Sequence, residues 1–387
     1  MGDWPLAELG DKTPLEAAAT PNMDELAAMS LMGTIRTVPP EMPPGSDVAN
    51  MALFGFDPAR YHTGRGPIEA AAQGLVLDPD DLVWRTNLVT IDDFAPSALM
   101  RDYSAGHIST DVAAQVITDL QEHLGNDTFT LHPGVQYRHT LVQKGGAVQP
   151  EADILVRPPH DITDQPMDED FAAFASSQRL YDLVRAAFER MQSLDSGAAN
   201  AIWPWGQGRP LILDDFKKSF GLAGAVVTAV DLVRGLGRAA NMAVLEVEGV
   251  TGLLNTNYEG KVAATLDFLQ HGDFVYLHVE APDECGHSGI ASDKVEAMQR
   301  FDARIVAPLR QALAGQDVVF VVTCDHYTPI VERTHTHDPV PFIAAIDGVA
   351  PNHTNTTFSE ALANQADIHL DAGHEFLPWL LDRIHNR

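Results

Sequence analysis

The sequence has few of the residues that would point to a secreted or a nucleic-acid-binding protein. Its 387 residues include only two cysteines, Cys285 and Cys324, so no disulfide framework is expected. Basic residues are also scarce, because 25 lysines and arginines stand against 54 acidic residues, a formal net charge of -29. A field of this sign repels nucleic acid and anionic membranes, and we expect neither as a partner.

Long apolar runs are missing as well, and no stretch is long enough to cross a bilayer. The chain opens without the pattern of a secretory signal. We therefore expect a cytoplasmic protein that acts on a small molecule, and the sequence leaves its oligomeric state open. Hydrophobic residues make up 45% of the chain, enough for a substantial core in one large or two ordinary domains.

The C-terminal half alternates between apolar runs and helical periodicity. The runs that predict buried strands are residues 242–249, 273–280, 317–323 and 341–347. Helical periodicity covers residues 225–241 and 293–313. Alternation of this kind favours an α/β fold with a doubly wound, mostly parallel sheet, in which ligands bind at the carboxyl ends of the strands.

The middle of the chain has a different character. Helical stretches at residues 111–125 and 176–194 are separated by connections rich in proline and glycine. We expect residues 63–215 to form a smaller α/β domain. That domain would be inserted into a discontinuous one made of residues 1–62 and 216–387.

One short stretch, "EAPDECGHSG" at residues 280–289, gathers several side chains that can bind metal. Asp283 and His287 are four positions apart, so one helical turn or a tight loop could direct both toward the same point. Carboxylates and imidazoles are usual ligands of divalent metals. In so acidic a chain, the stretch could instead be a solvated surface loop, and the other motifs have to decide.

Two further clusters belong to the same predicted edge of the sheet. Asp325 and His326 directly follow the next strand, and His335 and His337 come just before the one after it. Near the N-terminus, Ser46 stands in "PPGSDVAN", between a glycine and an apparent helix. Each feature has an ordinary explanation as a capped turn, a solvated loop or an N-cap serine. Together they favour a site.

These residues suit phosphoryl transfer, because two metal ions a few ångströms apart can clamp both ends of an in-line displacement. One ion could take Asp283, His287 and one histidine of the third cluster. The other could take Asp325, His326 and the hydroxyl of Ser46. Coordination would lower the pKa of this hydroxyl, so that Ser46 could act as a nucleophile at neutral pH. The start of the apparent helix at Ser46 would also favour a bound phosphate, through its backbone N–H groups and the helix dipole. Mixed carboxylate and imidazole ligands suit Mn, Zn or Co, whereas Mg prefers more oxygen.

Specific stretches run in order from one end of the chain to the other. They are "GDWPLAELGDKTPLEAAATPNMDELA", "PPGSDVANMALFGFDP", "YHTGRGPIEAAAQG", "YSAGHIST", "GVQYRH", "PPHDI", "WPWGQGRP", "TNYEGK", "EAPDECGH", "CDHYTP" and "HTHDPVPF". In these motifs the chain resembles the archaeal-type, 2,3-bisphosphoglycerate-independent phosphoglycerate mutases of the alkaline phosphatase superfamily. The resemblance implies an alkaline-phosphatase-like fold with a metal-binding domain and an inserted substrate-binding domain.

The resemblance also implies a reaction and its residues. Ser46 would accept the phosphate of 3-phosphoglycerate and return it to the 2-hydroxyl of the same glycerate, without 2,3-bisphosphoglycerate. Two divalent ions would assist, with manganese preferred over magnesium, zinc or cobalt. The third-cluster ligand corresponds to His335, which leaves His337 a bystander, and Lys261 would stabilise charge near the nucleophile. The residues expected to hold the substrate are His107, Arg138, Arg209, Arg65 and Arg85.

Two features depart from the family pattern. Family members have Gly-Asp-Gly-Met ahead of the "GDWP" seen here, at the end of a first strand, and that aspartate ligates the metal of the serine. The sequence starts at Met1, and Asp3 is offset by several residues, so either the start site is placed too late or the second metal site is crippled. The first alternative is favoured, because the loss of a central strand would expose the apolar core and the sheet edges. The second departure is Cys324, where the family often has glycine; it could add a soft ligand, but a packing role is favoured.

Two other functions stay open on the sequence alone. A relative could pass phosphate from Ser46 to a different acceptor, such as homoserine, or to water, because the first half-reaction is shared. The third hypothesis is that the protein is a metal-poor, non-catalytic relative. Its basis is the missing aspartate of the Gly-Asp-Gly-Met motif.

Overall fold

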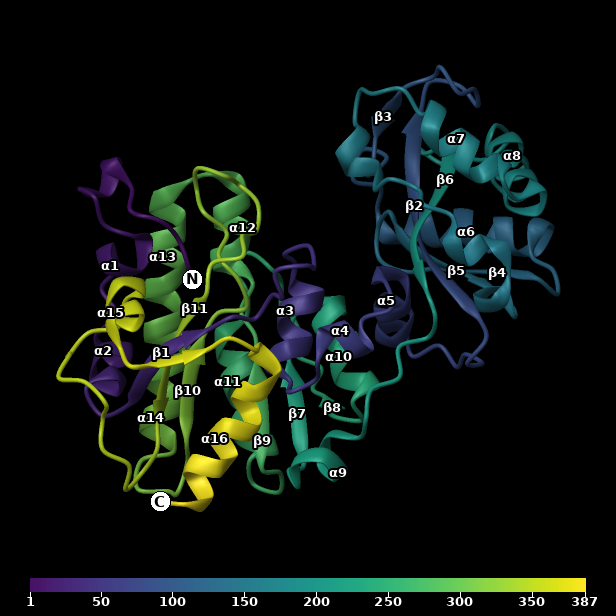
Figure 1. Cartoon of the computed structure of the whole chain (residues 1–387). Coiled ribbons are helices and arrows are strands. Elements are labelled where there is room, and N and C mark those ends of the chain that lie inside the picture. The colour runs from purple at the N-terminus through teal and green to yellow at the C-terminus, as the bar shows by residue number, and fades with distance from the viewer. The chain divides into compact units, whose positions relative to one another are not determined.

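The computed structural model describes all 387 residues, which divide into two compact units (Figure 1). Unit 1 consists of Met1–His62 and Leu213–Arg387, and unit 2 is the intervening segment Thr63–Ile212. The expected inserted domain, 63–215, begins at the same residue as unit 2 and ends just beyond it. None of the helices has the length and apolar character that a bilayer crossing requires.

Unit 1 contains two separate sheets. The strands of the four-stranded sheet, in spatial order, are β10 (Phe320–Thr323), β11 (Val340–Ala345), β1 (Leu31–Ile35) and β12 (Ile368–Leu370). Those of the three-stranded sheet are β8 (Ala243–Val244), β7 (Gly224–Val227) and β9 (Phe274–Leu277). The second sheet is parallel throughout, and β1 is parallel to β12.

The expectation of one mostly parallel sheet needs correction at β11. This strand runs antiparallel to both of its neighbours, β10 and β1. The reason lies in the connection, because a parallel neighbour requires a crossover, usually through a helix. No helix forms between β10 and β11, so the chain turns back and pairs antiparallel.

Helices cover both faces of the sheets in unit 1 (Figure 1). They are α1 (Pro14–Ala17), α2 (Pro21–Ala27), α3 (Ser46–Leu53), α4 (Pro58–Tyr61), α9 (Phe216–Phe220), α10 (Asp231–Ala239), α11 (Tyr258–Phe268), α12 (Ala281–Ser288), α13 (Ala291–Phe301), α14 (Ala307–Ala312), α15 (Glu360–Gln365) and α16 (Phe376–His385). A π-helical turn, Asp302–Val306, joins α13 to α14. On β1, Met32 faces a core that includes Met298 of α13, whereas Ile35 faces a core with Phe376 of α16.

Residues 225–241, expected to form one helix, instead form a strand and a helix. β7 ends at Val227 and α10 begins at Asp231. The first residues of the segment, Ala225 to Val227, are fully buried between β8 and β9, where β-branched side chains pack well. The helical periodicity is confined to the second part. The predicted strand 242–249 is also shorter, because β8 covers only Ala243–Val244.

Unit 2 has a five-stranded antiparallel sheet covered by helices. Its strands are β2 (Leu82–Ile91), β3 (Met100–Asp102), β4 (Phe129–His132), β5 (Arg138–Gln143) and β6 (Ala201–Gly208). Its helices are α5 (Arg65–Gln73), α6 (Thr110–Leu124), α7 (Asp168–Ala175) and α8 (Gln178–Met191). Trp84 and Trp203 are completely buried in its core. Helices α6 and α8 lie where the sequence predicts them.

A buried ion pair anchors the first residues of the chain. The Nζ of Lys294, on α13, lies 2.7 Å from Oδ2 of Asp3, and both side chains are 0% exposed. The same Nζ donates to the carbonyl oxygens of Gly2 at 3.1 Å and Thr328 at 2.8 Å. Asp3 is therefore committed to a structural ion pair, which ties the N-terminus to the loop that follows β10.

Replacing Lys294 with methionine is expected to destabilise the protein by about 3–5 kcal/mol, because Asp3 would remain buried without a countercharge. Urea unfolding followed by circular dichroism measures the loss. The double variant D3N/K294M serves as the control and should lose clearly less, since it removes both charges. A loss below about 1 kcal/mol for K294M alone would contradict a structural role for the pair.

Candidate active site

The first metal-capable cluster is built on α12. The stretch 280–289, considered as a loop, is helical here, so Asp283 and His287 lie one turn apart on the same face. Oδ2 of Asp283 is 3.2 Å from Nε2 of His287, and its Oδ1 is 3.5 Å from Nε2 of His335. The ligand atoms of these three residues all lie within 4.8 Å of one another. One carboxylate and two imidazoles at this spacing fit a divalent transition metal.

Electrostatics within this cluster keep Asp283 ionised. Burial raises the pKa of its carboxyl group, but hydrogen bonds from His287 and His335 lower it more, so that the net pKa is well below its ordinary value. The hydrogen bond to Asp283 raises the pKa of His287 to about 9. In the metal-free protein, His287 is thus an imidazolium at neutral pH. A metal ion would replace its proton.

The second cluster adjoins the first and contains the serine. Ser46 is the first residue of α3, and its Oγ lies 2.9 Å from Nε2 of His326. That nitrogen is also 3.3 Å from Oδ2 of Asp325. Nδ1 of His326 lies 4.0 Å from Oδ1 of Asp283, and its ring packs against that of His335 at 3.8 Å between centroids. Ser46 and residues of all three clusters found in the sequence therefore meet at one place.

Asn50, which sequence reasoning missed, connects the serine to Asp325, and Tyr276, also missed, bonds to Asn50. Nδ2 of Asn50 donates to the carbonyl oxygen of Ser46 at 2.8 Å and to Oδ2 of Asp325 at 2.9 Å. The hydroxyl of Tyr276, on β9, donates to Oδ1 of Asn50 at 2.7 Å. The signal that could have revealed Asn50 is its position four residues after Ser46, one turn along the same helix face.

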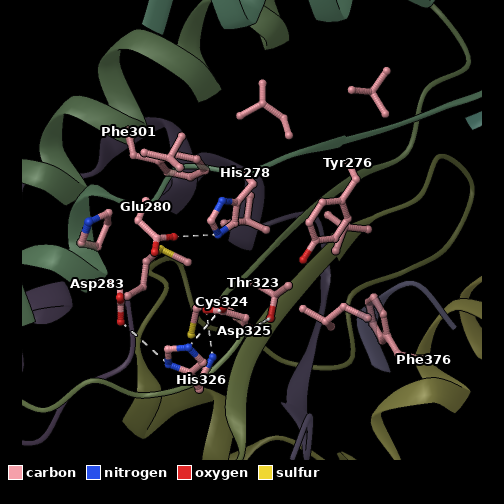
Figure 2. A pocket seen from close by; sticks show the side chains of 18 of the residues that line it. Tyr276, His278, Glu280, Asp283, Phe301, Thr323, Cys324, Asp325, His326 and Phe376 are labelled. Carbon is pink, nitrogen blue, oxygen red and sulfur yellow. Dashed lines mark hydrogen bonds and ion pairs between the residues drawn. The ribbon is translucent and has the colours of Figure 1, made fainter. Parts of the chain in front are cut away.

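A cavity of about 180 Å³ opens beside these clusters. Figure 2 shows His326 between Asp283 and Asp325, with Glu280 and His278 above them. Oε2 of Glu280 lies 3.3 Å from Nε2 of His278. Burial raises the pKa of Glu280 well above its ordinary value, and the nearby carboxylates of Asp283 and Asp325 raise it further. The pair was not singled out from the sequence, although Glu280 stands in the quoted motif.

Lys261, on α11, is fully buried beside this pair. Its Nζ donates to the carbonyl oxygen of His278 at 2.8 Å, and burial lowers its pKa to about 8. The resemblance places Lys261 near the nucleophile, whereas its direct contact here is with the backbone just after β9. Its role in charge stabilisation stays a prediction.

The two histidines of the third cluster separate in the structure. His335 lies beside Asp283 and His287, the two residues of the cluster that α12 carries. Nε2 of His337 instead bonds to the carbonyl oxygen of Met42 at 2.8 Å. The ligand role that the resemblance implies for His335 stays a prediction. Cys324 is buried in an apolar cluster that includes Phe342, and burial raises the pKa of its thiol. Its surroundings fit the packing role favoured for it.

In unit 2, three of the predicted arginines lie near one another. Arg85 is buried on β2, where its guanidinium pairs with Glu69 and lies 4.9 Å from the ring of Trp205. Nε of Arg65 is 3.5 Å from the same carboxylate. Burial lowers the pKa of Arg85 to about 10, and the charges of Arg65 and Arg138 act in the same direction. Arg65 and Arg85 share the carboxylate of Glu69, and the charge of Arg138 acts on Arg85 as well, so the cluster carries excess positive charge.

His107 and Arg209 have other surroundings. The ring of His107 lies 6.5 Å from that of Tyr137, which in turn is 5.4 Å from the guanidinium of Arg138. Arg209 donates to the carbonyl oxygen of Ala147 at 3.1 Å and lies 3.8 Å from Asp80.

His160, which sequence reasoning passed over, lies close to the arginine cluster in unit 2. Burial lowers its pKa, and the charges of Arg65 and Arg85 act in the same direction, against Asp161. Its ring lies 5.6 Å from that of Trp205, the residue that also packs against Arg85. The signal was available, because His160 stands in the quoted "PPHDI".

Comparison with known proteins identifies the family. A family model described as 2,3-bisphosphoglycerate-independent phosphoglycerate mutase matches residues 27–195. A protein of Geobacter sulfurreducens, named as a probable mutase of this kind, is 42% identical over 99% of this chain and 98% of its own length. The chain belongs to this family. A mutase of the same name from Methanosarcina barkeri is 40% identical over 96% of this chain and 94% of its own length.

Solved structures show that this chain shares its fold with known proteins. A protein from Pyrococcus horikoshii superimposes with a TM-score of 0.81 and 27% identity, covering 100% of this chain and 95% of its own. A cofactor-independent phosphoglycerate mutase from Thermoplasma acidophilum has a TM-score of 0.65 and 24% identity, with 99% and 97% coverage, and shows a shared fold. The relatives of 40% and 42% identity confirm the family resemblance drawn from the sequence motifs.

Proposed function

We propose that this chain interconverts 3-phosphoglycerate and 2-phosphoglycerate without 2,3-bisphosphoglycerate, through a phosphoserine at Ser46. The observation that carries the proposal is the convergence of Ser46, His326 and the Asp283 cluster at one cavity, within a chain of this family. Unit 1 would be the alkaline-phosphatase-like catalytic domain, and unit 2 the substrate-binding domain.

Two divalent ions would fit the donor atoms, manganese being preferred. Asp283, His287 and His335 would hold one of them. Asp325, His326 and the hydroxyl of Ser46 would hold the other. When bound, the ions neutralise charge on the phosphoryl group and lower the pKa of the serine hydroxyl.

The protein groups around Ser46 position the phosphoryl group for both half-reactions. In the first, Oγ of Ser46 bonds to phosphorus as the bond from phosphorus to the 3-oxygen of glycerate breaks, and the serine proton passes to that oxygen. In the second, the 2-oxygen displaces Oγ, and the 2-hydroxyl proton returns to the serine. The N–H groups and the helix dipole at the start of α3 favour the phosphate. Asn50 holds both the serine turn and Asp325.

The arginine cluster of unit 2 would bind the anionic substrate. Arg65, Arg85 and Arg138 carry more positive charge than Glu69 neutralises, and guanidinium groups match carboxylate and phosphate oxygens in geometry. Glycerate released from phosphate would stay bound through these contacts while it reorients. His107 and Arg209 remain proposed contributors.

Replacing Arg138 with methionine is expected to lower kcat/KM by about 100-fold, since a desolvated contact to an anion is lost. Arg101→Met is the matched control. It removes an exposed arginine of the same unit that pairs with Asp92 and Asp164, and activity should stay within about threefold. Steady-state kinetics measures both variants. Equal effects of the two substitutions would contradict a role for the cluster in substrate binding.

The test of the function is a coupled assay that follows 2-phosphoglycerate through enolase. The chain would be given 3-phosphoglycerate and Mn²⁺, with no 2,3-bisphosphoglycerate. We expect steady formation of 2-phosphoglycerate. Release of inorganic phosphate alone, or phosphorylation of an added acceptor such as homoserine with no 2-phosphoglycerate, would overturn the mutase assignment in favour of a related phosphotransferase.

A further inference from the structure

One buried asparagine lies at the centre of the arginine cluster of unit 2. Asn87 stands on β2 and is 0% exposed, two residues after Arg85, so both side chains leave the same face of the strand. Its partner across the sheet on β5 is Arg138, and Trp205 on β6 is the partner of Arg85 (Figure 1). Sequence reasoning passed over Asn87, although two of the arginines expected to hold the substrate flank it in the sheet.

A buried amide is costly unless both of its ends are bonded, and those of Asn87 are. Its Oδ1 accepts two hydrogen bonds, from Nε of Arg85 at 3.1 Å and from Nε1 of Trp205 at 3.1 Å. Its Nδ2 donates to the carbonyl oxygen of Tyr103 at 2.9 Å. Two donors at one end and an acceptor at the other fix the orientation of the amide, because a flipped amide would oppose like groups at all three contacts.

The guanidinium of Arg85 is thereby held in one plane. Its Nε is bonded to Asn87, and its Nη1 is bonded to Glu69. The ring of Trp205 lies 4.9 Å from the guanidinium carbon, and the N–H of that ring is bonded to the same oxygen of Asn87. Neither bond of Arg85 uses Nη2, the nitrogen that can then face a carboxylate or phosphate oxygen. Guanidinium groups bind such oxygens with strict geometry, so the plane of Arg85 matters.

The acceptor of the Asn87 amide belongs to a firmly held loop. Just after Tyr103, the three successive residues Ala105–His107 have φ of 50°, 70° and 53°. This left-handed conformation costs free energy for the two that are not glycine, and such strain persists only where the surroundings hold it. Both carboxylate oxygens of Asp102 accept bonds from backbone N–H groups of the loop, each at 2.7 Å. The carbonyl oxygen of Tyr103 is therefore held in place, and it holds the amide of Asn87 in turn.

We infer that Asn87 is a positioning residue, which acts through Arg85 on the binding of the anionic substrate. Since this role needs Arg85 to contact a phosphate or carboxylate group of phosphoglycerate, it rests on the proposed function. Asn87 is completely buried, so its effect reaches the substrate through the guanidinium that it orients. Without its Oδ1, Arg85 and Trp205 both lose an acceptor, and the guanidinium can turn away from the geometry that the anion requires.

Asn87→Ala and the matched control Asn200→Ala test this role. Asn200 also bonds through both ends of its amide, but to the backbone N–H and carbonyl oxygen of Ile91, the last residue of β2, at 2.8 and 2.7 Å. Steady-state kinetics measures conversion of 3-phosphoglycerate with Mn²⁺. We expect Asn87→Ala to raise KM about 30-fold and to change kcat by less than about threefold. Asn200→Ala should lower thermal stability as well, with both constants within about threefold of the parent.

A second background shows whether the effect passes through Arg85. In Arg85→Met, the further substitution Asn87→Ala should lower kcat/KM by less than about threefold, because the group that Asn87 orients is already gone. Circular dichroism confirms that each variant is folded. If Asn87→Ala does not fold, Asn87→Val takes its place with the same expectations, since a β-branched side chain suits the interior of a strand.

The outcomes separate this role from the proposed function. Equal KM values for Asn87→Ala and Asn200→Ala, with a parent that makes 2-phosphoglycerate, would overturn the role of Asn87 and leave the proposed function standing. A loss on Asn87→Ala that is as large in the Arg85→Met background as in the parent would also overturn it. A parent that makes no 2-phosphoglycerate would instead overturn the proposed function, and the role of Asn87 with it.

Discussion

Replacing Ser46 with alanine is expected to lower kcat by about 10⁴-fold or more, because the oxygen that receives the phosphoryl group is removed. The fold should be unaffected, since the hydroxyl of Ser46 bonds only to His326 and does not cap α3. The enolase-coupled assay measures the rate, and mass spectrometry of acid-quenched enzyme measures the phosphoryl adduct. The adduct should be absent from the variant and present on the peptide that carries Ser46 in the parent.

Ser288→Ala is the matched control for this substitution. Ser288 ends α12, the helix of the metal cluster, and its hydroxyl donates to the carbonyl oxygen of Cys285 at 2.9 Å. Its loss should change kcat by less than about threefold. If the Ser46 variant kept more than a few per cent of the parent rate, or if the phosphoryl group were found on another residue, the nucleophile would have been misassigned.

Replacing Asp283 with asparagine is expected to weaken binding of Mn²⁺ by about 100-fold or more. Asp283 supplies the only carboxylate among the three donors, and its oxygens face both His287 and His335. The hydroxyl of Thr328 donates to the same carboxylate and fixes its orientation. Isothermal titration calorimetry measures the affinity. An asparagine variant that binds the metal as tightly as the parent would remove Asp283 from the ligand set.

The same calorimetric titration, repeated at several pH values, tests how the affinity for the metal depends on pH. The pKa of His287 is raised to about 9 in the metal-free protein, so at pH 7 a metal ion has to displace its proton. Affinity should therefore rise about tenfold per pH unit from pH 7 toward 9 and then level off. In Asp283→Asn the hydrogen bond that raises the pKa is lost, the pKa returns toward about 6.5, and the rise should end near neutral pH.

Proton release provides an independent readout of this linkage. Titrations at pH 7 in two buffers of different ionisation enthalpy should show about one proton released per metal ion bound to this cluster in the parent. Far fewer protons should be released by Asp283→Asn. A parent protein that releases none would show that His287 is neutral without metal, which contradicts its ion pair with Asp283.

The parts of the site that sequence predicts well are those with local spacing. Asp283 and His287 are related by one helical turn, and Asp325 and His326 directly follow a strand, so pattern alone brings them to one edge. Ser46 at the start of a helix follows from its glycine-preceded position. Each of these arguments needs only a few neighbouring residues.

The parts that sequence could not supply depend on partners far along the chain. The coupling of Asn50 to Asp325 and Tyr276 joins residues more than two hundred positions apart. The helical reading of residues 225–241 was wrong only for its first residues, where burial between two strands overrode the local periodicity. The reversal at β11 follows from a connection without a crossover helix, which strand patterns alone do not reveal.

The clearest test of the central claim is a phosphorus NMR time course on the 387-residue chain with Mn²⁺. The sample holds unlabelled 3-phosphoglycerate and an equal amount of free ¹³C-labelled glycerate, with no 2,3-bisphosphoglycerate. We predict a growing 2-phosphoglycerate signal without coupling to ¹³C, because Ser46 returns the phosphate to the glycerate that stayed bound. Phosphate transferred to labelled glycerate, or no 2-phosphoglycerate at all, would contradict the account.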